Sequence, residues 1–138
     1  MPLNPDDWKA AQVELCTPEN HPGSTADAKT AWAAVARDYF GNITLPAATP
    51  ANQAAGEAAF AAAFDPSLGL AAFVPSLTAY AAQLALALPS SVVPPAPFVP
   101  PTLPNTYDTD APAVAMATAV DIWTRTGTGP PPASAPWS

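Results

Sequence analysis

Apolar residues recur along this chain at helical spacing, and proline or a short polar side chain marks the start of most periodic segments. The first start is Asn4-Pro5-Asp6-Asp7, in which an amide can cap the helix and proline occupies the first helical position at no cost. The two carboxylates lie at the positive end of the helix dipole. A helix over residues 5–16 is therefore predicted.

Two further helices are predicted from the same kinds of signal. Ser24 and the residues after it fit a capping box, and they open a helix over residues 25–41. The apolar side of this helix carries Ala28, Trp32, Val35, Tyr39 and Ile43. Thr49-Pro50 repeats the pattern of cap and proline, which predicts a third, alanine-rich helix over residues 50–64.

The fourth predicted helix is the main candidate for the core helix. After Asp65-Pro66 restarts the chain, apolar residues from Leu70 to Leu88 are spaced alternately three and four positions apart. Pro75 lies inside this segment, where it removes a backbone donor and clashes with the preceding turn. We therefore expect a kink or a break at that residue.

Proline dominates residues 89–112, which excludes a helix through most of this stretch and favours extended backbone. The segment also carries apolar side chains, whereas a flexible spacer would carry serine, glycine and charge. We expect an arm that lies in a groove, either of its own chain or of a neighbour. Asp110-Ala111-Pro112 then starts a last helix that ends near Thr126, and residues 127–138 form a second extended tail.

These elements predict an all-α fold, a small bundle of four or five alanine-rich amphipathic helices with extended proline-rich arms. The 138 residues are enough for one domain. Its helical body covers residues 1–88, the arm 89–112, a C-terminal helix that packs on the body 113–126, and the tail 127–138. The expected core residues are Trp32, Tyr39, Phe73, Leu77, Tyr80 and Leu84.

The charge of the chain excludes several classes of function. Four Lys and Arg against eleven Asp and Glu give a net charge of −7, and no basic patch could hold a nucleic-acid backbone. A single cysteine permits no intrachain disulfide. The N-terminal segment lacks the basic and apolar regions of a secretory signal, so we expect synthesis and use in the cytoplasm.

Side chains that perform acid–base or metal chemistry are scarce. Cys16 and His21, with Glu14 and Glu19 nearby, could be drawn as a metal site, but Cys-x4-His lacks the second ligand pair of a structural zinc site. The single histidine has no nucleophile beside it other than Cys16, and no nucleotide-binding or nucleophile-elbow motif occurs. We therefore expect no catalytic residue, no metal and no cofactor.

Residues 68–88 carry no charge and are long enough to cross a bilayer. The stretch contains Gly69, Pro75 and several polar residues, and no lysine or arginine flanks it to fix an orientation. A helix buried in an assembly is therefore favoured over a membrane span. A small membrane-active protein built on this stretch stays open as an alternative.

Four apolar side chains of the arm and the tail are predicted to contact a partner, namely Phe98, Val99, Leu103 and Trp137. A tryptophan at the tip of an extended tail, beyond a run of prolines, typically fills a pocket on another protein. A frayed tail with an idle tryptophan is the alternative.

Several features together resemble small structural proteins of tailed bacteriophages, of the kind found in the head, neck, tail and baseplate. They are the start Met1-Pro2-Leu3-Asn4-Pro5, the alanine-rich helices with Phe60, Phe64 and Tyr80, and the helix from Ala113 to Trp123 that runs into Thr126-Gly127-Thr128-Gly129. The resemblance implies a non-enzymatic virion subunit that is made in the host cytoplasm and forms homo-oligomeric rings or arrays. Its partners would be copies of itself and other virion structural proteins.

A second interpretation, from another class of function, stays open. A soluble helical adaptor or assembly chaperone would share this composition but would bind its partner transiently. It would therefore be absent from the finished particle.

Overall fold

Five α-helices and one 3-10 helix make up most of the described chain, in the order α1 (Pro5–Leu15), α2 (Thr25–Phe40), α3 (Pro50–Ala63), η1 (Pro66–Ala72), α4 (Phe73–Leu86) and α5 (Ala111–Thr124). The structure is a computed structural model that describes residues 3–17, 19–20, 22–44, 49–86, 94–95, 97–103, 111–129 and 136–138. Over those ranges there is no strand, only an isolated antiparallel bridge between Thr128 and Pro136. The prediction of an all-α bundle is confirmed.

Three helices begin at the capping residues that the sequence predicts. Asn4 accepts a hydrogen bond from the backbone N–H of Asp6 at 3.0 Å, and Ser24 and Thr49 each cap the residue three positions on. Each bond satisfies a backbone donor that has no partner inside its helix. Because these signals are local, the predicted bounds of α1, α2 and α3 agree with the observed ones to within one residue.

The fourth predicted helix is divided, and the division lies earlier than expected. Gly69 has φ +60° and ψ −132°, a conformation that glycine adopts without a Cβ clash, and it bends the chain inside η1. A new helix, α4, then begins at Phe73. Pro75 consequently lies in the first turn of α4, where backbone N–H groups have no partner within the helix. The expected break is therefore present in this segment, but it lies at Gly69 and before the start of α4, not at Pro75.

Part of the uncharged stretch is covered by the rest of the chain. Pro66–Leu86 has a length and a mean hydropathy of 1.4 that fit a membrane span. However, α4 has 14 residues and is only about 21 Å long, against roughly 30 Å for the hydrocarbon core of a bilayer. The α4 side chains that are buried in the core include Phe73, Leu77, Tyr80 and Leu84.

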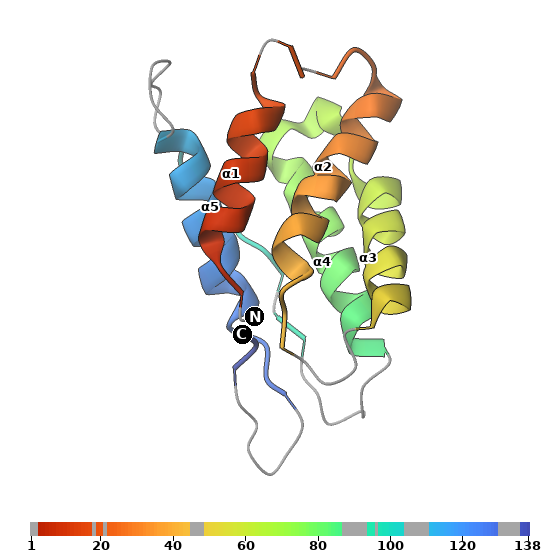
Figure 1. The fold of residues 1–138 in the computed structure, drawn as a ribbon, viewed down its shortest axis with the longest axis vertical. Helices are drawn as coiled ribbons and strands as arrows, with labels where there is room; N and C mark the ends of the chain where they lie inside the picture. Colours follow the sequence, from red (N-terminus) through yellow and green to blue (C-terminus); the bar gives the residue numbers. More distant parts are fainter. Residues whose placement is uncertain are drawn as a thin grey trace.

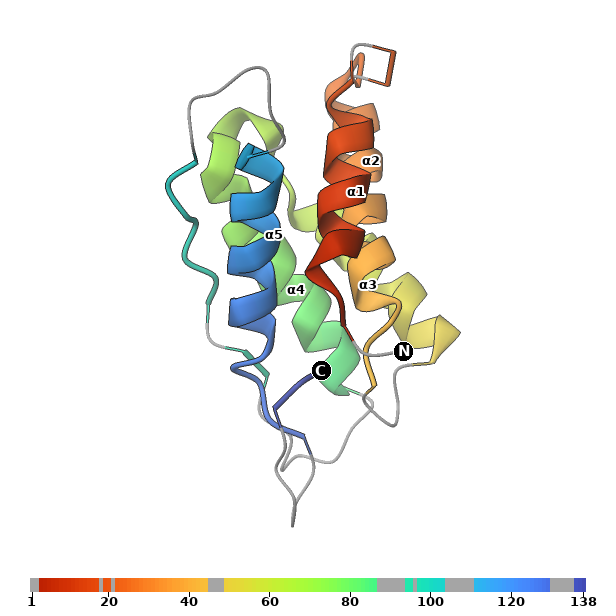
Figure 2. The ribbon, with the colours of Figure 1, turned by 60° about the vertical axis from the view of Figure 1, so that its left-hand side comes forward.

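The helices contact one another in the order α5, α1, α2, α3, α4. Figure 1 shows α1 and α5 side by side and running in opposite directions, and in Figure 2 α4 lies behind and between them. The C-terminal helix, α5, therefore packs on the body through its contact with α1. The contact between α3 and α4 is close at Gly56, where an added Cβ would lie 2.6 Å from Cε1 of Tyr80.

Five of the six predicted core residues are buried, namely Tyr39, Phe73, Leu77, Tyr80 and Leu84. The sixth, Trp32, packs against the core but is only partly buried. Its ring meets that of Phe73 edge-on, with 5.2 Å between the centroids. The core cluster also includes seven aromatic side chains outside that predicted set, namely Trp8, Phe40, Phe60, Phe64, Phe98, Trp123 and Trp137.

Buried hydrogen bonds tie α2, α3 and α4 together. Tyr80 donates its hydroxyl proton to Oε1 of Gln53 at 2.5 Å, and Nε2 of Gln53 donates to the backbone carbonyl of Phe40 at 2.8 Å. Among the described residues, no buried side-chain nitrogen or oxygen lacks a hydrogen-bond partner. A buried tyrosine and a buried glutamine are therefore accommodated without the cost of an unpaired polar group.

A second polar network joins α2, α5 and the N-terminal segment. The Tyr39 hydroxyl donates to Asp121 at 2.6 Å, and Nε of Arg125 donates to the same carboxylate at 3.0 Å. Arg125 also donates to the backbone carbonyl of Leu3 at 3.0 Å. Asp121 and Arg125 together thus hold the C-terminal end of α5 against α2 and against the start of the chain.

Candidate interaction surface

The described part of the proline-rich arm lies along the bundle beside α5 (Figure 2). Phe98 is 2% exposed, and its ring meets that of Trp123 edge-on with 5.6 Å between the centroids. Leu103 is half-buried and packs against the core. Val99, between them, is 80% exposed. Of the two grooves that the sequence left open for the arm, residues 97–103 occupy the one on their own chain.

The described end of the C-terminal tail folds back onto the body. Trp137 is fully buried, its backbone N–H donates to the carbonyl of Gly127 at 2.9 Å, and its indole N–H donates to the carbonyl of Thr128 at 3.2 Å. The carbonyl of Ser138 accepts from the backbone N–H and the hydroxyl of Thr44 at 2.7 and 2.9 Å. The prediction that Trp137 fills a pocket on a partner does not hold in this conformation, because the side chain is enclosed by its own chain.

Gly127 makes a close contact that no local sequence pattern indicates. The last helix, α5, ends at Thr124, earlier than the expected end near Thr126, so Gly127 is not the residue that directly follows it. A Cβ at Gly127 would lie 2.8 Å from Cδ2 of Trp137. Glycine therefore lets the indole lie directly against the backbone. A glycine shortly after a helix and a tryptophan near the end of the chain do not by themselves indicate this contact.

Two of the four predicted partner-binding side chains, Phe98 and Trp137, offer no surface to a partner in this conformation. Leu103 offers only part of its surface, and Val99 offers most of it. Ile122 on α5 is 64% exposed as well. Val99 and Ile122 are the immediate neighbours of Phe98 and Trp123, the two rings in contact. We call these two exposed side chains the Val99–Ile122 patch; they are grouped by their exposure and because the arm and α5, which carry them, lie side by side (Figure 2).

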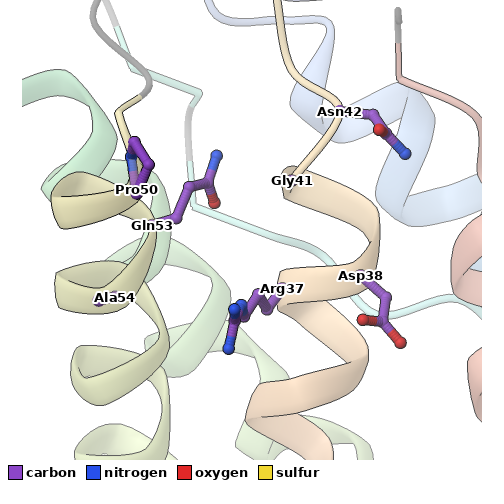
Figure 3. A pocket seen from close by; sticks show the side chains of 7 residues that line it. All are labelled: Arg37, Asp38, Gly41, Asn42, Pro50, Gln53 and Ala54. Carbon is purple, nitrogen blue, oxygen red and sulfur yellow. The ribbon is translucent and has the colours of Figure 1, made fainter.

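A polar pocket of about 390 Å³ lies between the end of α2 and the start of α3 (Figure 3). Figure 3 shows Arg37 pointing toward α3 and Asp38 pointing to the other side of α2. Arg37 pairs with Glu57 at 3.1 Å, while burial raises the pKa of Asp38 despite the neighbouring guanidinium. Gln53 is engaged in the buried bonds described above. These polar groups do not converge on one point, so the pocket has no obvious ligand chemistry.

The side chains that could be drawn as a metal or thiol site belong to the C-terminal end of α1 and to the residues that follow it in the sequence. Across the described ranges, no group of three or more His, Cys, Asp and Glu side chains could hold a metal ion. Cys16 is at the surface, and partial burial of its thiol raises its pKa, which lowers the fraction of reactive thiolate. His21 lies outside the described residues.

No protein-family model, curated protein or solved structure matches this chain.

Proposed function

We propose that this chain is a non-enzymatic structural subunit of a tailed-bacteriophage virion, a neck, tail or baseplate component that binds neighbouring subunits. The resemblance of its sequence to small phage structural proteins supports this class. Its partners are copies of itself, in a ring or array, and other virion structural proteins. The chain performs no chemistry in this role and contributes only contact surface.

The observation that carries the proposal is the Val99–Ile122 patch. Val99 and Ile122 are 80% and 64% exposed, although both are large apolar side chains whose burial is favourable. Each is adjacent in sequence to a ring of the buried Phe98–Trp123 pair, so the backbone that presents it is anchored. An anchored apolar side chain binds with a small loss of conformational freedom, which favours its use as a contact.

In this proposal, the four residues predicted from the sequence to contact a partner, Phe98, Val99, Leu103 and Trp137, have different roles. Leu103 is half-buried and contributes only part of its surface. Val99 contacts the neighbouring subunit. Phe98 and Trp137 act as positioning residues, because they hold the arm and the tail against the body and so fix the shape of the surface.

The test uses the full chain in particles of the virus whose genome encodes it. Mass spectrometry of purified virions should find the wild-type chain at a fixed copy number. The double variant Val99→Asp, Ile122→Asp should fold as the wild type does, because both side chains are exposed, but it should be lost from the particles since two carboxylates cannot be buried in an apolar contact. Circular dichroism checks the fold.

The matched control is Thr102→Asp, Val114→Asp. It places the same two charges on the same two elements, the arm and α5, at exposed positions, and Val114 lies about two helical turns from Ile122. This control should enter particles normally. Incorporation of the patch variant at the wild-type level would refute the proposed contact. Detection of the chain in assembly intermediates but not in finished virions would refute a structural role and would identify the chain as an assembly chaperone.

A further inference from the structure

An apolar pocket of about 320 Å³ is lined in part by η1 and by the C-terminal end of α1. These two segments lie at the same end of the bundle (Figure 1). The lining of the pocket comes from α1, α2, η1, α4, α5 and the arm. Gly69 borders it, and a Cβ added to that glycine would meet no heavy atom within 4 Å. Because Gly69 is itself exposed, the pocket is open on the side of this glycine.

Three aromatic rings that contact one another form part of the wall. The centroid of Phe73 lies 5.2 Å from those of both Trp32 and Phe64, and both contacts are edge-on. Trp32 is the predicted core residue that is only partly buried, and it lines this pocket. A further ring in the pocket would complete the aromatic cluster and cover surface of Trp32 that the chain leaves open.

The described lining of the pocket also contains two sulfur atoms and no charged side chain. Cys16 and Met116 contribute sulfur, which interacts favourably with the edges of aromatic rings. Among the described residues that line this pocket, none carries a charge, and the polar side chains are Gln12 and the thiol of Cys16. The other pockets described for this molecule each include at least one acidic side chain.

We propose that this pocket binds a neutral, planar aromatic compound of one or two fused rings. Its volume is at the lower end of the range for small-molecule sites and about twice that of a cavity that holds benzene, roughly 150 Å³. A charged ligand would lose its hydration without gaining a partner of opposite charge. The aromatic rings and the sulfur atoms favour a ring over an aliphatic chain. Ligand binding at this site is independent of the Val99–Ile122 patch and does not depend on the proposed virion role.

The first experiment uses the unmodified full chain and 2-naphthol, which is neutral at pH 7. The chain has four tryptophans, and their indole N–H signals in a ¹⁵N-labelled sample can be followed together. Titration should shift the Trp32 signal saturably and leave the Trp137 signal unchanged, because Trp137 is enclosed away from the pocket lining. The Trp32→Phe variant assigns the signal. No saturable shift, or equal shifts of all four signals, would overturn the proposal.

The second experiment fills the pocket. Leu103 lines it and is half-buried, so Leu103→Trp should occupy the space and weaken 2-naphthol binding at least about tenfold in calorimetry. Thr102→Trp is the matched control, since it adds the same indole at the preceding, exposed position that does not line the pocket. Equal affinity of the two variants, with both folded by circular dichroism, would contradict the site. If Leu103→Trp does not fold, the titration of the wild-type chain alone decides.

Discussion

The packing of α3 on α4 depends on a residue without a side chain. A Cβ at Gly56 would lie 2.6 and 2.7 Å from Cε1 and Cδ1 of Tyr80. That ring cannot easily retreat, because it stacks on Phe40 with 4.6 Å between centroids and its hydroxyl donates to Gln53. Glycine is otherwise unfavourable inside a helix, so the contact accounts for its presence in α3.

The first prediction concerns Gly56→Ala. Alanine is the better helix former by about 1 kcal/mol, but the added methyl overpacks a fully buried contact. We expect a net loss of about 1–3 kcal/mol in the free energy of unfolding, measured by urea denaturation.

The control for this prediction is Gly23→Ala. An added Cβ at Gly23 meets nothing within 4 Å, so its effect on stability should stay within about 0.5 kcal/mol. A Gly56→Ala variant as stable as the wild type would mean that α3 and α4 can separate without cost, contrary to the packing described here.

At the scale of elements, the arm is anchored through one residue and exposed at the next. Extended backbone directs successive side chains to opposite sides, which places Phe98 against Trp123 and Val99 in solvent. Proline composition predicted the extended conformation but not which of the two adjacent residues is buried. That choice depends on contact with α5, a partner distant in sequence.

The second prediction compares these neighbours. Phe98→Ala should lower the free energy of unfolding by about 3–5 kcal/mol, because it removes a large buried ring. Val99→Ala should change it by no more than about 0.5 kcal/mol. Thermal or urea unfolding of the two variants measures the difference, and equal effects would show that the arm does not pack on α5 in solution.

For the whole molecule, two buried tyrosines connect stability to alkaline pH. Burial, followed by the hydrogen bond to Asp121, raises the pKa of Tyr39 far above its ordinary value, and burial likewise raises the pKa of Tyr80. Both groups are therefore favoured in the neutral form in the folded state. Their contribution to stability is complete below the unfolded-state pKa of about 10 and is lost as the pH rises above it.

The third prediction is that the free energy of unfolding is insensitive to these tyrosines between pH 7 and 9 and falls above about pH 10, by up to about 1.4 kcal/mol per pH unit for each. Tyr39→Phe should be less stable than the wild type at neutral pH, since it loses the bond to Asp121, but should show a shallower alkaline decline. Denaturant titrations from pH 8 to 11.5 measure both effects. An unchanged slope in Tyr39→Phe would contradict a neutral, buried Tyr39.

The sequence by itself determined the helices that begin with local signals. The caps at Asn4, Ser24 and Thr49 and the apolar spacing after them fixed three helices to within a residue, because each capping bond joins groups two or three positions apart. The same spacing identified five buried core residues and the all-α class. Pro75 was expected to mark the break in the fourth predicted helix. The helix starts again at Phe73, so this proline lies in the first turn of α4, and a local sequence pattern does not locate that start.

Only the tertiary structure decided where the arm and the tail lie. The bond between Thr44 and Ser138 joins residues 94 positions apart, and the Tyr39–Asp121 bond joins residues 82 apart. No short-range pattern encodes such contacts, since they depend on the summed packing of several helices. The same cause explains why Trp137 is enclosed in its own chain, why Val99 is exposed, and why an aromatic pocket opens beside Gly69.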